Sequence, residues 1–142
     1  MDREIQQLRL DLLLAYTKFC KVANQLSPLL RSETGVCGDW SPKEVVAHLV
    51  GWDALFQDFI VDPENFDPPI DVNQFNSQAV ATLKQLTWAE LMHELEDSFR
   101  GLEQALSTVQ PDLKIYPRVM MWCQGRIEDY ELHTGQLAAW LA

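Results

Sequence analysis

The chain has 142 residues, of which 47% are hydrophobic, and is expected to form a single domain, residues 1–142. A domain of this size can bury a hydrophobic core without disulfides or a structural metal. Because 21 acidic residues outnumber 11 basic ones, the net charge of −10 excludes nucleic acid and anionic membranes as expected partners. We expect a cytoplasmic protein for three reasons. The three cysteines include no CxxC pair, no apolar run approaches the roughly 18 residues of a membrane span, and the N-terminus is polar.

The first predicted helix is long and amphipathic. Apolar residues recur at spacings of three and four over residues 5–26, which is the pattern of one buried helical face. Pro28 is expected to end this helix, and the glycine-containing residues 31–39 form a turn-rich connection.

The second helix has a clear start at Pro42. Ser41 is a favourable N-cap, Pro42 suits the first helical position, and Glu44 completes a capping box. The helix is expected to run to about Ile60, and His48 flanks its buried stripe. That stripe is predicted to comprise Val45, Leu49, Trp52, Phe56 and Phe59.

A proline-rich acidic segment, residues 62–69, separates this helix from the next and is expected to cross the surface as a mobile loop. Asp71 then provides an N-cap for a third helix. Because Thr87 and Glu90 form a second capping box, the third helix should restart or kink there before Pro111 ends it.

The last predicted helix spans residues 117–141. Its buried stripe is expected to contain Cys123, Ile127, Tyr130, Leu137 and Leu141. Four long amphipathic helices joined by connections of unequal length predict an all-α protein, a four-helix bundle. A mixed fold is the weaker alternative, because a short extended piece at residues 115–119 has no partner strand.

A polar ribbon borders the buried stripe of the last helix. It comprises Trp122, Arg126, Asp129, His133, Gln136 and Trp140. Asp129 and His133 are four residues apart, so their side chains can converge on one ion, and His48 can supply a third ligand. Two imidazoles and one carboxylate suit a divalent metal such as zinc, nickel, iron or manganese.

Other interpretations of these residues stay open. The three polar side chains can instead form a hydrogen-bonded cluster without metal. Cys37 precedes the second helix and offers nucleophilic chemistry, although Asp39 opposes a thiolate there, and Cys123 lies on the core stripe. His93 is expected to face solvent and to take no part.

Two segments resemble a known family. The chain resembles the DinB/YfiT-like superfamily and, within it, the DfsB/ClbS-like branch. The resemblance lies in WSPKEVVAHLVGW at residues 40–52, in DYELH at residues 129–133 and in the Trp-Leu pair that follows. The resemblance implies a four-helix bundle with a long crossing connection between the second and third helices, frequent homodimers, and a metal held by three histidines. His48 and His133 match two of these histidines, whereas Asp129 stands in the place of the third.

Relatives implied by this resemblance include metal-dependent hydrolases, thiol-dependent transferases and proteins that protect against toxic small molecules. The sequence-based hypothesis is therefore a metal-dependent hydrolase for a small-molecule ligand, with His48, Asp129 and His133 as metal ligands. The walls of its pocket are expected to be Trp52, Trp122, Arg126 and Trp140, with Arg126 available to hold an anionic group. The alternatives are a metal-free binding or protective module and a thiol-dependent transferase.

Overall fold

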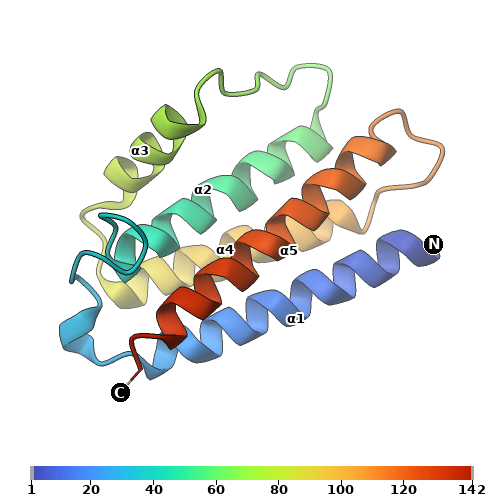
Figure 1. Ribbon diagram of the computed structural model, residues 1–142. Helices are drawn as coiled ribbons and strands as arrows, with labels where there is room; N and C mark the ends of the chain where they lie inside the picture. The colour runs from blue at the N-terminus through green and yellow to red at the C-terminus, as the bar shows by residue number, and fades with distance from the viewer. Residues whose placement is uncertain (1, 142) are drawn as a thin grey trace.

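The computed structural model describes residues 2–141, which form five α-helices and no strand (Figure 1). The helices are α1 (Arg3–Gln25), α2 (Pro42–Val61), α3 (Val72–Leu83), α4 (Trp88–Leu106) and α5 (Tyr116–Ala138), and a 3₁₀ turn at Pro28–Leu30 follows α1. The piece considered as extended around residues 115–119 is helical from its second residue. None of the helices in residues 2–141 is long and apolar enough to cross a membrane.

The four long helices pack side by side as a bundle, and the short helix α3 lies outside it (Figure 1). Helix α1 packs mainly against α5, α2 packs against α4 and α5, and α3 packs against α2. The predicted all-α helical bundle is therefore confirmed. The long connection from α2 to α4 contains α3 and holds it over one face of α2.

The core lies between the four long helices. Each contributes large side chains that are fully buried, among them Phe19 from α1, Phe56 from α2, Leu95 from α4 and Tyr130 from α5. Helix α3, in contrast, contributes no fully buried residue. Its position is therefore set by contacts with the outer face of α2, and these contacts matter for the site described below.

Local capping interactions explain where the helices start. The Ser41 hydroxyl accepts a hydrogen bond from the Glu44 N–H at 3.2 Å, and the Glu44 carboxylate accepts one from the Ser41 N–H at 3.1 Å. Thr87 and Glu90 form the same reciprocal pair at the start of α4. The predicted restart at Thr87 is confirmed, and it divides the third predicted helix into two separate helices, α3 and α4.

Gly51 allows α3 to approach α2 closely. A Cβ atom at this position would lie 2.8 Å from the Cβ of Ala79, which is closer than two carbon atoms can pack. We therefore expect Gly51→Ala to push α3 away from α2 and to lower the free energy of unfolding by about 1–3 kcal/mol, the usual cost of overpacking. Urea denaturation of the purified variant measures this change.

A matched control is Gly135→Ala in α5, where an added Cβ meets no atom within 4 Å. Alanine favours the helix there, so this variant should be more stable than the wild type by about 0.5–1 kcal/mol. If Gly51→Ala were stabilising to the same extent, α3 would not be held against α2 at Gly51.

Candidate functional site

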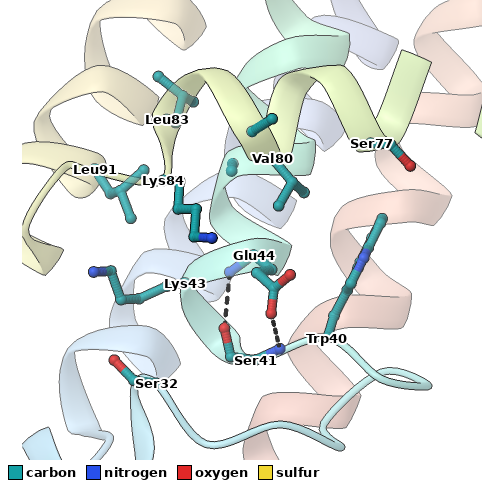
Figure 2. A pocket seen from close by; sticks show the side chains of 12 residues that line it. Ser32, Trp40, Ser41, Lys43, Glu44, Ser77, Val80, Leu83, Lys84 and Leu91 are labelled. Carbon is teal, nitrogen blue, oxygen red and sulfur yellow. Dashed lines mark hydrogen bonds between the residues drawn. The ribbon is translucent and has the colours of Figure 1, made fainter. Parts of the chain in front are cut away.

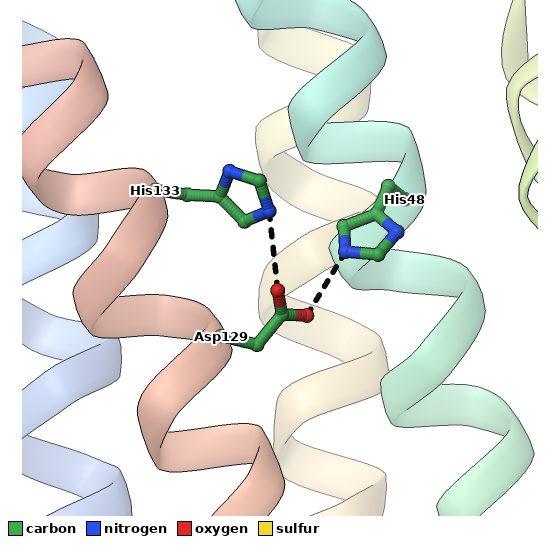
Figure 3. A group of neighbouring side chains, drawn as sticks. All are labelled: His48, Asp129 and His133. Carbon is green, nitrogen blue, oxygen red and sulfur yellow. Dashed lines mark hydrogen bonds and ion pairs between the residues drawn. The ribbon is translucent and has the colours of Figure 1, made fainter. Parts of the chain in front are cut away.

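The structure brings His48 of α2 together with Asp129 and His133 of α5 (Figure 3). One oxygen of Asp129, Oδ2, lies 2.9 Å from His48 Nε2, and the other, Oδ1, lies 3.1 Å from His133 Nε2. The ligand atoms of the three side chains all lie within 4.8 Å of one another. His48 is 8% exposed and His133 is 3% exposed, so the group is largely shielded from water.

The outer nitrogens of the two histidines face amide oxygens. His48 Nδ1 lies 3.0 Å from Asn76 Oδ1, which also accepts a 2.6 Å hydrogen bond from the indole N–H of Trp52. Because an indole N–H only donates and an amide oxygen only accepts, the Trp52 contact fixes the orientation of Asn76 and makes His48 Nδ1 a donor. Asn76 belongs to α3, so the docked α3 helix sets the orientation of the His48 ring.

His133 has an equivalent partner within α5. Its Nδ1 lies 2.7 Å from Gln136 Oε1, one helical turn away. Both histidines therefore anchor Nδ1 and turn Nε2 toward Asp129. Histidines that bind metals in proteins show this arrangement, in which one ring nitrogen donates to an oxygen and the other is left for the ion.

A buried ion-pair network lies next to Asp129. Arg126 donates from Nη1 to Asp129 Oδ2 at 2.5 Å and from Nε to Asp53 Oδ1 at 2.9 Å. The Tyr130 hydroxyl donates to the other Asp53 oxygen at 2.5 Å. Asp53 is 0% exposed and Arg126 is 4% exposed, so one guanidinium group connects two carboxylates inside the protein.

This network controls the ionisation of both aspartates. Burial raises the pKa of Asp53, although Arg126 and the Tyr130 hydrogen bond oppose that rise. Burial also acts to raise the pKa of Asp129, but the close contacts of its oxygens with His133 and His48 and the charge of Arg126 outweigh it and hold this pKa well below its usual range. Asp129 is therefore ionised at neutral pH, as a metal ligand requires.

An open depression of about 380 Å³ borders the site. Its lining includes His48 and Asp129 together with Trp52, Trp122 and Arg126, three of the four residues expected as pocket walls. Trp122 is held in place by a stacked contact with Phe56 at 4.7 Å between ring centroids. Arg126 uses Nε and Nη1 on the two aspartates, and its buried Nη2 has no partner within residues 2–141.

Trp140, the fourth residue predicted as a pocket wall, does not line this depression. It lines a separate hollow with Leu30 and Leu141, near the end of α1. The reason is that α5 ends at Ala138. The helical spacing that would place Trp140 in line with His133 therefore no longer applies at residue 140.

The other candidates from the sequence lie away from this site. His93 is exposed on α4, as expected, and pairs with Asp97. Cys123 is buried, and burial raises the pKa of its thiol to about 12, so it is a packing residue and not a nucleophile. Cys37 is half-buried in the connection before α2, where it forms an isolated backbone bridge with Trp40.

Asp53 and Asn76 are two site residues that were not predicted from the sequence. A signal for Asp53 was present, because it follows Leu49 by four residues and precedes Phe56 by three, which places a charged side chain on the buried stripe. The predicted stripe contains Trp52 instead, and Trp52 is only half-buried. No comparable signal marks Asn76, because its role depends on the docking of α3.

Comparisons with known proteins agree with this fold. The family model of the mycothiol maleylpyruvate isomerase N-terminal domain matches residues 20–138. A crystal structure of an uncharacterised protein from Escherichia coli UTI89 superposes with a TM-score of 0.81 over 99% of this chain and 94% of the other, at 16% sequence identity, which shows the shared fold. No curated protein matched the sequence. The chain belongs to the family of mycothiol maleylpyruvate isomerase N-terminal domains, within the DinB/YfiT-like superfamily.

Proposed function

We propose that the chain binds one divalent metal ion through His48, Asp129 and His133 and uses it to hydrolyse a small molecule. The observation that carries this proposal is the orientation of the two histidines. Both anchor Nδ1 to an amide oxygen and turn Nε2 toward the same carboxylate, so three ligand atoms converge within 4.8 Å.

The donor set fits a divalent cation. Two imidazole nitrogens and one carboxylate oxygen suit zinc, nickel, iron or manganese, and three protein ligands leave coordination positions open. A bound ion would supply Lewis-acid chemistry and make a nearby water more acidic, so that a nucleophile is available at neutral pH. Trp52 and Trp122 would then form apolar walls for the substrate, while Arg126 holds the Asp129 carboxylate in place.

Metal binding by variants tests this proposal. We expect His48→Ala and His133→Ala each to weaken the binding of zinc by more than about 100-fold, because loss of an outer partner alone costs 10- to 100-fold. Competition with a chromophoric chelator measures the affinity, and elemental analysis of protein purified without a metal-binding tag gives the stoichiometry. His93→Ala is the matched control, because it removes an exposed histidine on α4.

A metal-free binding or protective module is the second candidate. It is favoured by the fact that Arg126 donates to Asp129 and that both imidazoles lie against its oxygens, so imidazoles that carry a proton on Nε2 would satisfy the carboxylate without an ion. Substoichiometric metal that is insensitive to His48→Ala and His133→Ala would support this module and rule out the metal-dependent hydrolase.

Thiol-dependent transfer is a third candidate, and the family's name is what favours it, because it refers to a mycothiol-dependent isomerase. This function requires activity that depends on an added low-molecular-weight thiol. A hydrolase would instead turn over its substrate with water alone.

A further inference from the structure

A second hollow lies beside the metal-ligand cluster and shares one neighbour with it, because Trp40, which lines the hollow, has its ring centroid 5.1 Å from that of His48. It has a volume of about 590 Å³, within the range of small-molecule sites, and lies between the start of α2 and the end of α3 (Figure 2). None of His48, Asp129 and His133 lines it. The proposed metal chemistry therefore assigns no role to this hollow.

Two lysines form the charged part of this hollow. Lys43 comes from the first turn of α2 and Lys84 from the residue after α3, and in Figure 2 both lie on the side opposite Trp40. Lys43 is half-buried and Lys84 is exposed, and within residues 2–141 neither ammonium group forms a hydrogen bond or a close ion pair, although the charge of Lys43 acts on Glu90. Such an arrangement is notable in a chain with a net charge of −10, where acidic partners are abundant.

The acidic groups nearby are already engaged. Glu44 lines the hollow, but its carboxylate accepts the Ser41 N–H of the capping box. Glu90, which senses the charge of Lys43, lies outside the lining and accepts the Thr87 N–H. Among the lining residues alone, the two lysines and Glu44 leave an excess of one positive charge, which Glu90 reduces from outside the lining and which a ligand with one negative charge would balance.

The remaining walls are largely apolar. Val80 and Leu83 of α3 and Leu91 of α4 lie along one side, and the ring of Trp40 stands on another (Figure 2). Flat aromatic surfaces and branched aliphatic side chains favour a ligand with an apolar or aromatic body. The hollow thus combines an apolar surface with the half-buried Lys43 and the exposed Lys84 at one side.

We propose that this hollow binds a small organic carboxylate. Its carboxylate group lies between Lys43 and Lys84, and its apolar body packs against Trp40 and Leu91. The first N–H groups of α2 are already used, because Pro42 has none, the Lys43 N–H donates to the Arg31 carbonyl oxygen and the Glu44 N–H donates to the Ser41 hydroxyl. The two lysine side chains therefore hold the anion. This site goes beyond the proposed hydrolase and does not depend on it.

Binding of 1-naphthoate, followed by amide chemical shifts in NMR, tests the proposal. We expect shifts to cluster at the start of α2 and the end of α3, and we expect the neutral analogue 1-naphthalenemethanol to bind at least about fivefold more weakly. Lys43→Gln and Lys84→Gln should each weaken 1-naphthoate by about two- to fivefold, the range for partly exposed charge pairs. The double variant should abolish the preference for the anion.

The matched control is the pair Lys18→Gln and Lys21→Gln, which removes two exposed lysines from α1. A second variant, Ala81→Phe, places a ring in the hollow from an exposed position on α3 and should block both compounds. The titration is repeated with His48→Ala, so that carboxylate binding to a metal at the other site is not mistaken for binding here.

The proposal would be overturned by the absence of shifts with 1-naphthoate at millimolar concentration, by equal affinity for the neutral alcohol, or by unchanged binding in the double lysine variant. Shifts that appear around Trp122 and disappear in His48→Ala would place the carboxylate at the metal cluster and would likewise overturn it.

Discussion

Arg126→Met is expected to lower the free energy of unfolding by about 3–5 kcal/mol, because it leaves the buried carboxylate of Asp53 without its counter-charge. Methionine keeps much of the length of arginine, so the loss of packing is small compared with the electrostatic cost. The Tyr130 hydroxyl remains as a partner of Asp53, but a neutral donor does not replace the positive charge. Urea denaturation at neutral pH measures the change.

The pH dependence of this variant distinguishes the electrostatic cost from a simple packing defect. Burial already raises the pKa of Asp53, and removing Arg126 raises it further. The folded variant then binds a proton at Asp53 that the unfolded chain, with an aspartate pKa of about 3.9, has released. Because the folded state binds more protons, its stability rises as the pH falls. The deficit relative to the wild type should therefore be smaller at pH 5.5 than at pH 8.

Two further variants serve as controls. Adding Asp53→Asn to Arg126→Met removes the unpaired charge and should recover part of the lost stability, so the two changes are not additive. Arg100→Met removes an arginine that is 75% exposed on α4 and should change stability by less than about 0.5 kcal/mol. A deficit that is the same at both pH values, and that Asp53→Asn does not reduce, would show that Asp53 does not depend on the charge of Arg126.

The helices and their starting points could be predicted from the sequence because their causes are local. The capping boxes at Ser41 and Thr87 each involve residues three positions apart, so the pattern of residue types is sufficient. The convergence of Asp129 and His133 has the same origin, since residues four apart lie on one face of a helix. The family motif then pointed to His48 as their partner.

The parts that could not be predicted depend on tertiary contacts or on small differences in helical position. Adjacent residues differ by only about 100° around a helix, so the spacing alone did not decide between Trp52 and Asp53 as the buried residue. Asn76 reaches His48 only because α3 folds back onto α2 at Gly51. Trp140 lies elsewhere because α5 ends before it.

The network around Arg126 suggests why a carboxylate is accommodated at position 129. The guanidinium group contacts both Asp53 and Asp129, so the two negative charges share one positive charge inside the protein. Histidine at position 129 would leave Arg126 with Asp53 alone and would place a third imidazole beside a cation. Asp129 is thus linked electrostatically to Asp53, although the two residues lie on different helices.

Substitutions at Asp129 are therefore expected to affect metal binding as strongly as the loss of either histidine. Asp129→Asn keeps the shape of the side chain but removes its charge, and it should weaken the binding of manganese and zinc by more than about 100-fold, since carboxylate oxygen is the donor that manganese prefers. Asp97→Asn is a matched control, because Asp97 also pairs with a histidine four residues away but is exposed on α4. It should leave the affinity unchanged.

Asp129→His separates the two interpretations of the cluster. It provides three imidazoles, which favour zinc and nickel over manganese, so the ratio of zinc affinity to manganese affinity should rise by at least about tenfold relative to the wild type. Chelator competition with each metal measures this ratio. If the wild type binds neither metal while Asp129→His binds zinc tightly, the geometry of a metal site is present but Asp129 and Arg126 keep it metal-free. If neither protein binds metal, the three side chains act as a hydrogen-bonded cluster that joins α2 to α5.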